Sequence, residues 1–150
     1  MRVFLDANIL FSASFAKSVL REFLDGLSNV AELVTSQHAT EEARRNIAAK
    51  RAANSAALES FLRTVETRVV EAFNVDVKLA EKDIPILCGA IASHSDYLLT
   101  GDRKDFGPLY GKKIQGVKIV SVEMLVDELI TRKILSEDQH RPHPSKKRLR

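Results

Sequence analysis

The chain has 150 residues and a net charge of +3, which is enough length for one domain that buries most of its apolar surface. An apolar fraction of 45% and a charged fraction of 29% are ordinary for a globular domain, and no apolar run reaches the roughly 20 residues that span a bilayer. The single cysteine, Cys88, excludes an internal disulfide, and from the strand that starts at once at the N-terminus we expect no secretion signal. We therefore expect a cytoplasmic protein that has no membrane partner.

Short apolar strands alternate with amphipathic helices in the first half of the chain. The strand at 3–5 is apolar throughout and ends at Asp6, as strands do in a parallel sheet covered by helices. Residues 7–11 then turn away and tuck beneath the sheet. Apolar spacing and strong helix formers predict the next elements. These are helices at 17–27, 37–51 and 57–65 and strands at 31–35 and 68–70, the last of them a short edge strand.

The segment 83–106 organises the second half of the chain. Asp83 occupies an N-cap position and Pro85 the first turn of an apolar helix at 84–92, which we expect to be buried. A buried strand at 97–99 follows, and the residues TGDRKDF end it. A strand at 117–120 then leads to a last helix, which Ser121 caps and which extends to 135. The chain thus divides into a domain over 1–138 and a basic tail over 139–150, which we expect to be disordered.

The order of these elements predicts a three-layer α/β/α domain with a mostly parallel sheet of roughly five strands. In such sheets, ligands bind outside the carboxyl ends of the strands, at the point where the strand order reverses. Asp6 and Asp102 both follow strands, so the sheet would bring them to the same edge.

Each aspartate near this edge also has a purely structural interpretation. Asp6 and Asp83 stand where a side chain can cap a helix, and Asp102 can form an Asx turn. A turn explains one aspartate in TGDRKDF, but it explains Asp105 less naturally. Because the neighbours of Asp83 would bring it to the same end of the sheet, we favour a cluster of carboxylates.

The helix at 37–51 carries two adjacent acids that the helical pitch separates. Ala39, Ala43 and Ile47 define its apolar face at about 100° per residue. Glu42 lies roughly 100° from the centre of that face and Glu41 roughly 160°, so Glu42 can look into a cleft while Glu41 faces solvent. The alternative is that both acids only interact favourably with the helix dipole.

The absence of several known sequence motifs excludes several kinds of site. No CxxC, HExxH, GxSxG, GxxxxGK[ST] or GxGxxG pattern occurs, which removes zinc, common hydrolase, phosphate-loop and dinucleotide sites. Oxygen ligands without His or Cys select hard cations such as Mg²⁺ or Mn²⁺. Arg103 and Lys104, which stand between Asp102 and Asp105, are candidates to contact a nucleic-acid backbone, whereas an aromatic stacking platform is not expected.

Three blocks of the sequence, FLDANILFSA, SQHATEEARRNI and KDIPILCGAIASHSDYLLTGDRKDF, together resemble a PIN domain. The likeness spans residues 2 to about 130. Proteins of this family are metal-dependent ribonucleases, and many bacterial and archaeal members are VapC-type toxins of toxin–antitoxin pairs. The catalytic acids that the resemblance implies are Asp6, Glu42, Asp83, Asp102 and Asp105.

The resemblance also implies a cofactor and partners. Asp6, Asp83 and Asp102 would hold Mg²⁺ or Mn²⁺, with Asn8 and Thr100 as polar supports. The implied partners are RNA, a small antitoxin protein and a second copy of the chain. The alternative is a catalytically inactive PIN-like scaffold that binds RNA or a protein, but such a module has no reason to keep anions facing a polyanion.

Overall fold

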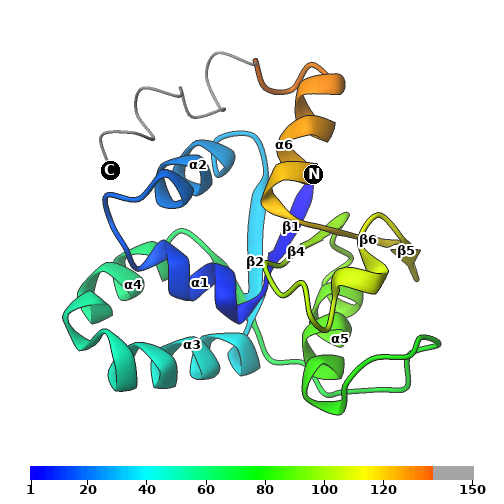
Figure 1. Ribbon diagram of the computed structural model, residues 1–150, viewed down its shortest axis with the longest axis horizontal. Helices are drawn as coiled ribbons and strands as arrows, with labels where there is room; N and C mark the ends of the chain where they lie inside the picture. The colour runs from blue at the N-terminus through cyan, green and yellow to red at the C-terminus, as the bar shows by residue number, and fades with distance from the viewer. Residues whose placement is uncertain (137–150) are drawn as a thin grey trace.

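Six strands form one sheet in the computed structural model, which describes residues 1–136 (Figure 1). They are β1 (Arg2–Leu5), β2 (Glu32–Ser36), β3 (Glu66–Arg68), β4 (Tyr97–Leu99), β5 (Lys113–Ile114) and β6 (Val117–Val120). Their order across the sheet is β3-β2-β1-β4-β6-β5, and every neighbouring pair is parallel except β5 and β6. The predicted α/β class with a mostly parallel sheet is confirmed, with six strands in place of roughly five.

Helices flank this sheet. They are α1 (Ala7–Ala13), α2 (Val19–Leu27), α3 (Gln37–Lys50), α4 (Ser55–Leu62), α5 (Ile84–Ala92) and α6 (Val122–Thr131). The first four pack on one another and gather to the left of β2 in Figure 1, whereas α5 lies to the right and contacts β1, β2 and β4. α6 packs against β6. Among residues 1–136, no helix is both long and apolar enough to cross a bilayer.

The strand order reverses beside β1. The chain runs outward from β1 through β2 to β3 and then returns to place β4 on the other side of β1, in register from Val3–Tyr97 to Leu5–Leu99. A ligand crevice of a doubly wound sheet lies at such a reversal, outside the carboxyl ends of the strands. β1 ends at Leu5 and β4 at Leu99, so the fold places Asp6 and Asp102, the predicted strand-end acids, at this crevice.

A serine N-cap begins three of the helices. Its hydroxyl accepts a hydrogen bond from a backbone N–H of the first turn that would otherwise have no partner. The Oγ of Ser36 accepts the N–H of Ala39 at 3.1 Å, and the Oγ of Ser121 accepts the N–H of Met124 at 3.2 Å. The cap at Ser121 is the one that the sequence analysis expected. Ser18 caps α2 in the same way.

A close approach between α5 and β1 fixes the helix on the sheet. Gly89 lies in α5 over the ring of Phe4, which is fully buried, and a Cβ at position 89 would stand 2.7 Å from its Cζ. Only glycine therefore lets the helix backbone come this near to the ring. Because Asp83 immediately precedes α5, this packing also sets the position of its carboxylate.

Several element boundaries differ from the sequence prediction. Residues 7–13 form the short helix α1 where only a turn was expected, the edge strand β3 lies at 66–68 and not 68–70, and α6 ends at Thr131 and not at 135. β5 was not predicted because it has two residues; it pairs with β6 through a turn in which Gln115 (φ 47°) and Gly116 (φ 90°) are both left-handed. The proposed tail at 139–150 lies outside the described residues, so the boundary at 138 stays a prediction.

We expect Gly89→Ala to destabilise the protein by up to about 2 kcal/mol, because overpacking of a core costs about 1–3 kcal/mol and the better helix propensity of alanine returns about 1 kcal/mol. Urea unfolding measures the difference. In a Phe4→Leu background, Gly89→Ala should cost less stability than it does in the wild type, since the smaller side chain makes room for the new methyl group. Strictly additive effects of the two substitutions would contradict the close contact.

Candidate functional site

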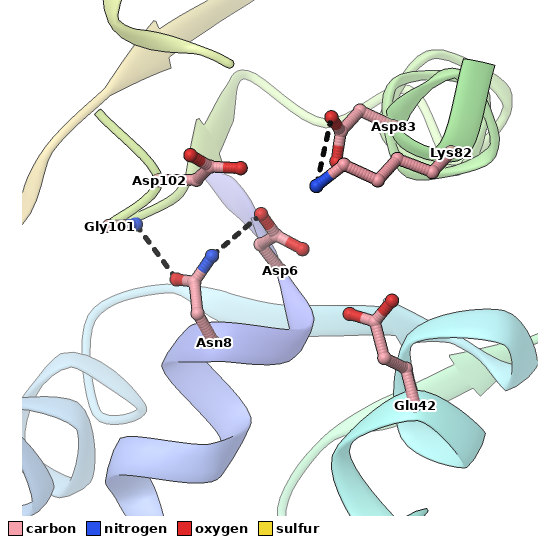
Figure 2. A pocket seen from close by; sticks show the side chains of 7 residues that line it. All are labelled: Asp6, Asn8, Glu42, Lys82, Asp83, Gly101 and Asp102. Carbon is pink, nitrogen blue, oxygen red and sulfur yellow. Dashed lines mark hydrogen bonds and ion pairs between the residues drawn. The ribbon is translucent and has the colours of Figure 1, made fainter. Parts of the chain in front are cut away.

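A cavity of about 330 Å³ opens at the carboxyl ends of β1 and β4 (Figure 2). It is lined by Asp6, Asn8, Glu42, Lys82, Asp83, Gly101 and Asp102. Four parts of the chain supply these residues: the junction of β1 and α1, helix α3, the residues that precede α5, and the loop after β4. The fold thus brings together segments that lie far apart in the sequence.

Asp6 lies at the floor of this cavity and is only 4% exposed. Its Oδ1 accepts the N–H of Ala7 at 2.6 Å, and its Oδ2 accepts the hydroxyl of Thr100 at 2.7 Å and the amide of Asn8 at 3.0 Å. Burial raises the pKa of Asp6, and the charges of Glu42 and Asp102 act in the same direction, although the bonds from Thr100 and Ala7 oppose it. Asp6 is therefore a buried carboxylate that protein donors hold in place.

Asn8 and Thr100 join the ends of the two central strands. The Oδ1 of Asn8 accepts the N–H of Gly101 at 2.8 Å, while its amide reaches Asp6 and, at 3.3 Å, the Oγ1 of Thr100. Thr100 is fully buried and also accepts the N–H of Asp102 at 3.1 Å. These bonds fix the loop after β4 against the start of α1, and both residues lie where polar supports of the site were expected.

Asp83 and Asp102 line the cavity and lie close to a third carboxylate, Asp105, which does not line it. One oxygen from each of Asp83, Asp102 and Asp105 lies within 4.8 Å of the others, and Asp83 is only 8% exposed. Within residues 1–136, the buried Oδ2 of Asp83 accepts no hydrogen bond, and its side chain does not cap α5. A buried acceptor without a donor is costly, and a cation held between the three acids would satisfy it.

The surroundings of Asp83 change its proton affinity. Burial, together with the carboxyl groups of Asp105 and Asp102, raises the pKa of Asp83 to about 6, against an opposing effect of the Lys82 ammonium. Lys82 lies 2.9 Å from the Oδ2 of Asp105 and 3.8 Å from the Oδ2 of Asp83, and Figure 2 shows its ammonium beside Asp83. The contact between Lys82 and Asp105 raises the pKa of Lys82 and lowers that of Asp105.

Asp102 combines the two interpretations that the sequence left open. Its Oδ1 accepts the N–H of Asp105 at 3.0 Å, which is the side-chain turn expected of an aspartate in such a loop. It also contributes an oxygen to the group with Asp83 and Asp105. Asp6 lines the same cavity but is not among these three acids, whereas the sequence resemblance placed Asp6 in the metal-binding set and Asp105 outside it.

The remaining candidates lie around the cavity or beside it. Glu42 is half-buried and faces the cavity from α3, while Glu41 is exposed and accepts a bond from the amide of Gln37 at 3.0 Å. Arg103 and Lys104 are exposed on the turn that Asp102 begins, next to the cavity and not in its lining.

Two lining residues, Lys82 and Gly101, were not singled out by the sequence analysis, and Lys82 is the charged one. A lysine directly before a candidate site acid was the available signal, but the contact with Asp105, 23 residues later, depends on how the loop after β4 folds. The donor set is also chemically uniform: among residues 1–136, no group of three or more possible metal ligands includes a His or Cys. Carboxylate oxygens are ligands that hard divalent cations prefer, so these three acids could bind a metal ion.

Comparison with solved structures identifies the fold. The chain is similar to one chain in the crystal structure of VapBC2 from Rickettsia felis, which is bound to a DNA fragment from the VapBC2 promoter. The TM-score is 0.60 and the sequence identity 18%, and the match covers 81% of this chain and 98% of the VapBC2 chain. None of the protein-family models and none of the curated proteins searched matches the chain. The protein therefore has the PIN-domain fold that its sequence resembles, and any activity has to be argued from the site itself.

We expect the metal-free protein to lose stability as the pH rises from about 4 to about 6, because the folded state raises the pKa of Asp83 to about 6 and so binds its proton more tightly than the unfolded chain does. This contribution is fully present below pH 4 and is lost as the pH passes about 6. The free energy of unfolding should fall by at most about 3 kcal/mol across this pH range. Unfolding in EDTA at several pH values measures it.

Asp83→Asn should flatten this pH dependence and stabilise the metal-free protein at pH 7. Asp76→Asn is the matched control, because Asp76 is exposed and does not line the cavity. If Asp83→Asn and Asp76→Asn keep the same slope as the wild type, Asp83 is not the strained carboxyl that its burial indicates.

Proposed function

We propose that this PIN-fold protein is a divalent-metal-dependent endoribonuclease that hydrolyses phosphodiester bonds at the cavity between β1 and β4. The observation that carries the proposal is the buried Oδ2 of Asp83, which has no hydrogen-bond donor and lies beside the carboxylates of Asp102 and Asp105. A fold tolerates such an arrangement when a cation completes it. The resemblance of the sequence to PIN domains supports RNA as the substrate.

The residues around the cavity fit the metal that the family resemblance implies. Asp83, Asp102 and Asp105 would hold the ion directly, and Asp6 would support it from the floor of the cavity. A bound Mg²⁺ or Mn²⁺ would supply charge to the phosphoryl oxygens and lower the pKa of a coordinated water. The hydrogen bonds from Thr100, Asn8 and Ala7 keep the Asp6 carboxylate from rotating.

Glu42 is the residue best placed to accept a proton from the attacking water. It projects into the cavity from α3, across from Asp83 (Figure 2), and it is half-buried. A carboxylate that neither caps a helix nor belongs to the cluster of three acids is free to act as a general base. Its neighbour Glu41 is turned away from the cavity and serves as an internal control.

The substrate is bound through its backbone in this proposal. Arg103 and Lys104 are exposed beside the cavity and can neutralise phosphates on either side of the scissile bond. Among residues 1–136, no aromatic side chain lines the cavity, so base stacking by this part of the chain contributes little there. Contacts to phosphates carry no sequence information, and we expect weak base selectivity from the described residues.

The proposal extends to a toxin of a toxin–antitoxin pair that acts in the cytoplasm, with a small antitoxin protein and a second copy of the chain as partners. Its support is the VapC-type resemblance of the sequence and the structural match to VapBC2. The alternative is a non-catalytic scaffold, and one observation favours it: the Lys82 ammonium already neutralises part of the carboxylate cluster. The two functions differ in whether the purified protein cleaves RNA.

We expect the purified protein to cleave RNA with Mn²⁺ or Mg²⁺ and to stop when EDTA is added. Glu42→Gln should lower the cleavage rate by about 10²–10⁴-fold, the usual contribution of a general base, while Glu41→Gln stays within about twofold of the wild type. Gel analysis of a labelled RNA measures both. Binding of RNA without cleavage at any metal concentration would establish the scaffold, and cleavage that persists in EDTA would exclude the metal mechanism.

We expect Asp102→Asn to separate the metal site from the fold. Asparagine keeps an Oδ1 that can accept the N–H of Asp105, so the turn should persist and the variant should be at least as stable as the wild type in EDTA. A ligand that binds only the native state at 100 times its Kd stabilises it by about 2.7 kcal/mol. Thermal melts with Mg²⁺ should show this gain for the wild type and little of it for the variant; clear destabilisation in EDTA would make Asp102 a structural residue only.

A further inference from the structure

Lys82 stands at the place where a cation would enter the carboxylate cluster. Its side chain is 71% exposed, yet its ammonium is directed toward Asp105 and Asp83, with N–O distances of 2.9 Å and 3.8 Å. The long lysine chain thus approaches the cluster from the solvent side. The two acids that it contacts are two of the three that lie within 4.8 Å of one another.

The lysine satisfies only part of the cluster. A distance of 2.9 Å is a hydrogen-bonded ion pair with Asp105, whereas 3.8 Å to Asp83 is too long for a hydrogen bond. The Oδ2 of Asp83 accordingly remains without a donor. One ammonium with a single charge cannot complete a site of three carboxylates, while a divalent ion can bind all of them at once.

We propose that Lys82 is a built-in counterion that occupies the cation position of the metal-free site and that Mg²⁺ or Mn²⁺ must displace. The inference rests on the metal site of the proposed function. Lys82 is in this sense a positioning residue: it holds Asp105 and Asp83 near each other without metal and sets how tightly the metal binds. After displacement its ammonium still lies at the cavity and is available to a phosphate of the substrate.

Competition makes an unusual prediction for metal affinity. Removing a side chain near a binding site normally weakens binding, but removing a competing cation strengthens it. An exposed ion pair changes affinity by up to about fivefold, and Lys82 makes two such contacts. Lys82→Gln should therefore bind Mn²⁺ about 3–10-fold more tightly than the wild type.

Two further variants separate direct competition from a general effect of charge. Lys82→Arg keeps the cation, and its Mn²⁺ affinity should stay near that of the wild type. Lys104→Gln removes a charge that also lowers the pKa of Asp105, but Lys104 makes no ion pair within residues 1–136. It should change the Kd by less than about twofold if direct contact decides the effect.

Calorimetric titration of the intact protein with Mn²⁺, together with thermal melts in EDTA and in Mn²⁺, tests the proposal without measuring activity. Lys82→Gln should melt below the wild type in EDTA, because the acids lose their counterion, and at or above it in Mn²⁺. A folded Lys82→Gln protein that binds Mn²⁺ with wild-type or lower affinity, or no more tightly than Lys104→Gln, would overturn the inference and leave the metal site intact. Failure of both the wild type and Lys82→Gln to bind Mn²⁺ would remove the metal site of the proposed function and this inference with it, whereas binding by Lys82→Gln alone would support the inference in its strongest form.

Discussion

Repulsion among carboxylates at the carboxyl ends of β1 and β4 is the constraint on which the rest of the structure depends. The sheet and α5 fix the acids from separate segments in one cavity, where burial weakens the screening that water would supply. Like charges held this close destabilise the folded state, and the buried core has to outweigh that cost. Burial is the main cause that raises the pKa of Asp6 and of Asp83, and the neighbouring carboxylates add to it.

The fold relieves the repulsion in two different ways. Asp6 receives hydrogen bonds from a backbone N–H, a hydroxyl and an amide, all of which belong to the surrounding scaffold and cannot leave. Within residues 1–136, Asp83 has no such donor on its buried oxygen, and the exposed side chain of Lys82 places its ammonium 3.8 Å away. Hydrogen bonds from the scaffold thus satisfy Asp6, whereas Asp83 has a charged oxygen that a cation can still bind. Within one cavity, the first acid is therefore suited to support and the second to binding.

Local signals account for what the sequence predicted well. Apolar strands, serine caps and the Pro85 helix start depend on a few neighbouring residues, and the helical pitch was enough to place Glu42 toward a cavity and Glu41 toward solvent. Other features depend on distances between remote segments. The proximity of Asp105 to Asp83 and the contact of Lys82 with Asp105 follow from the path of the loop after β4, which no spacing in the sequence encodes. The catalytic roles of these residues stay predictions.

The two sides of the carboxylate cluster are held by different kinds of interaction. Asp83 precedes α5, whose backbone lies against the buried ring of Phe4 at Gly89, so close packing sets its position. Asp102 and Asp105 lie on a turn in which Asp102 accepts the N–H groups of Asp105 and Phe106, and hydrogen bonds to Thr100 and Asn8 join that loop to the start of α1. Because each side is fixed by its own contacts, the fold keeps the three acids together although their charges repel one another.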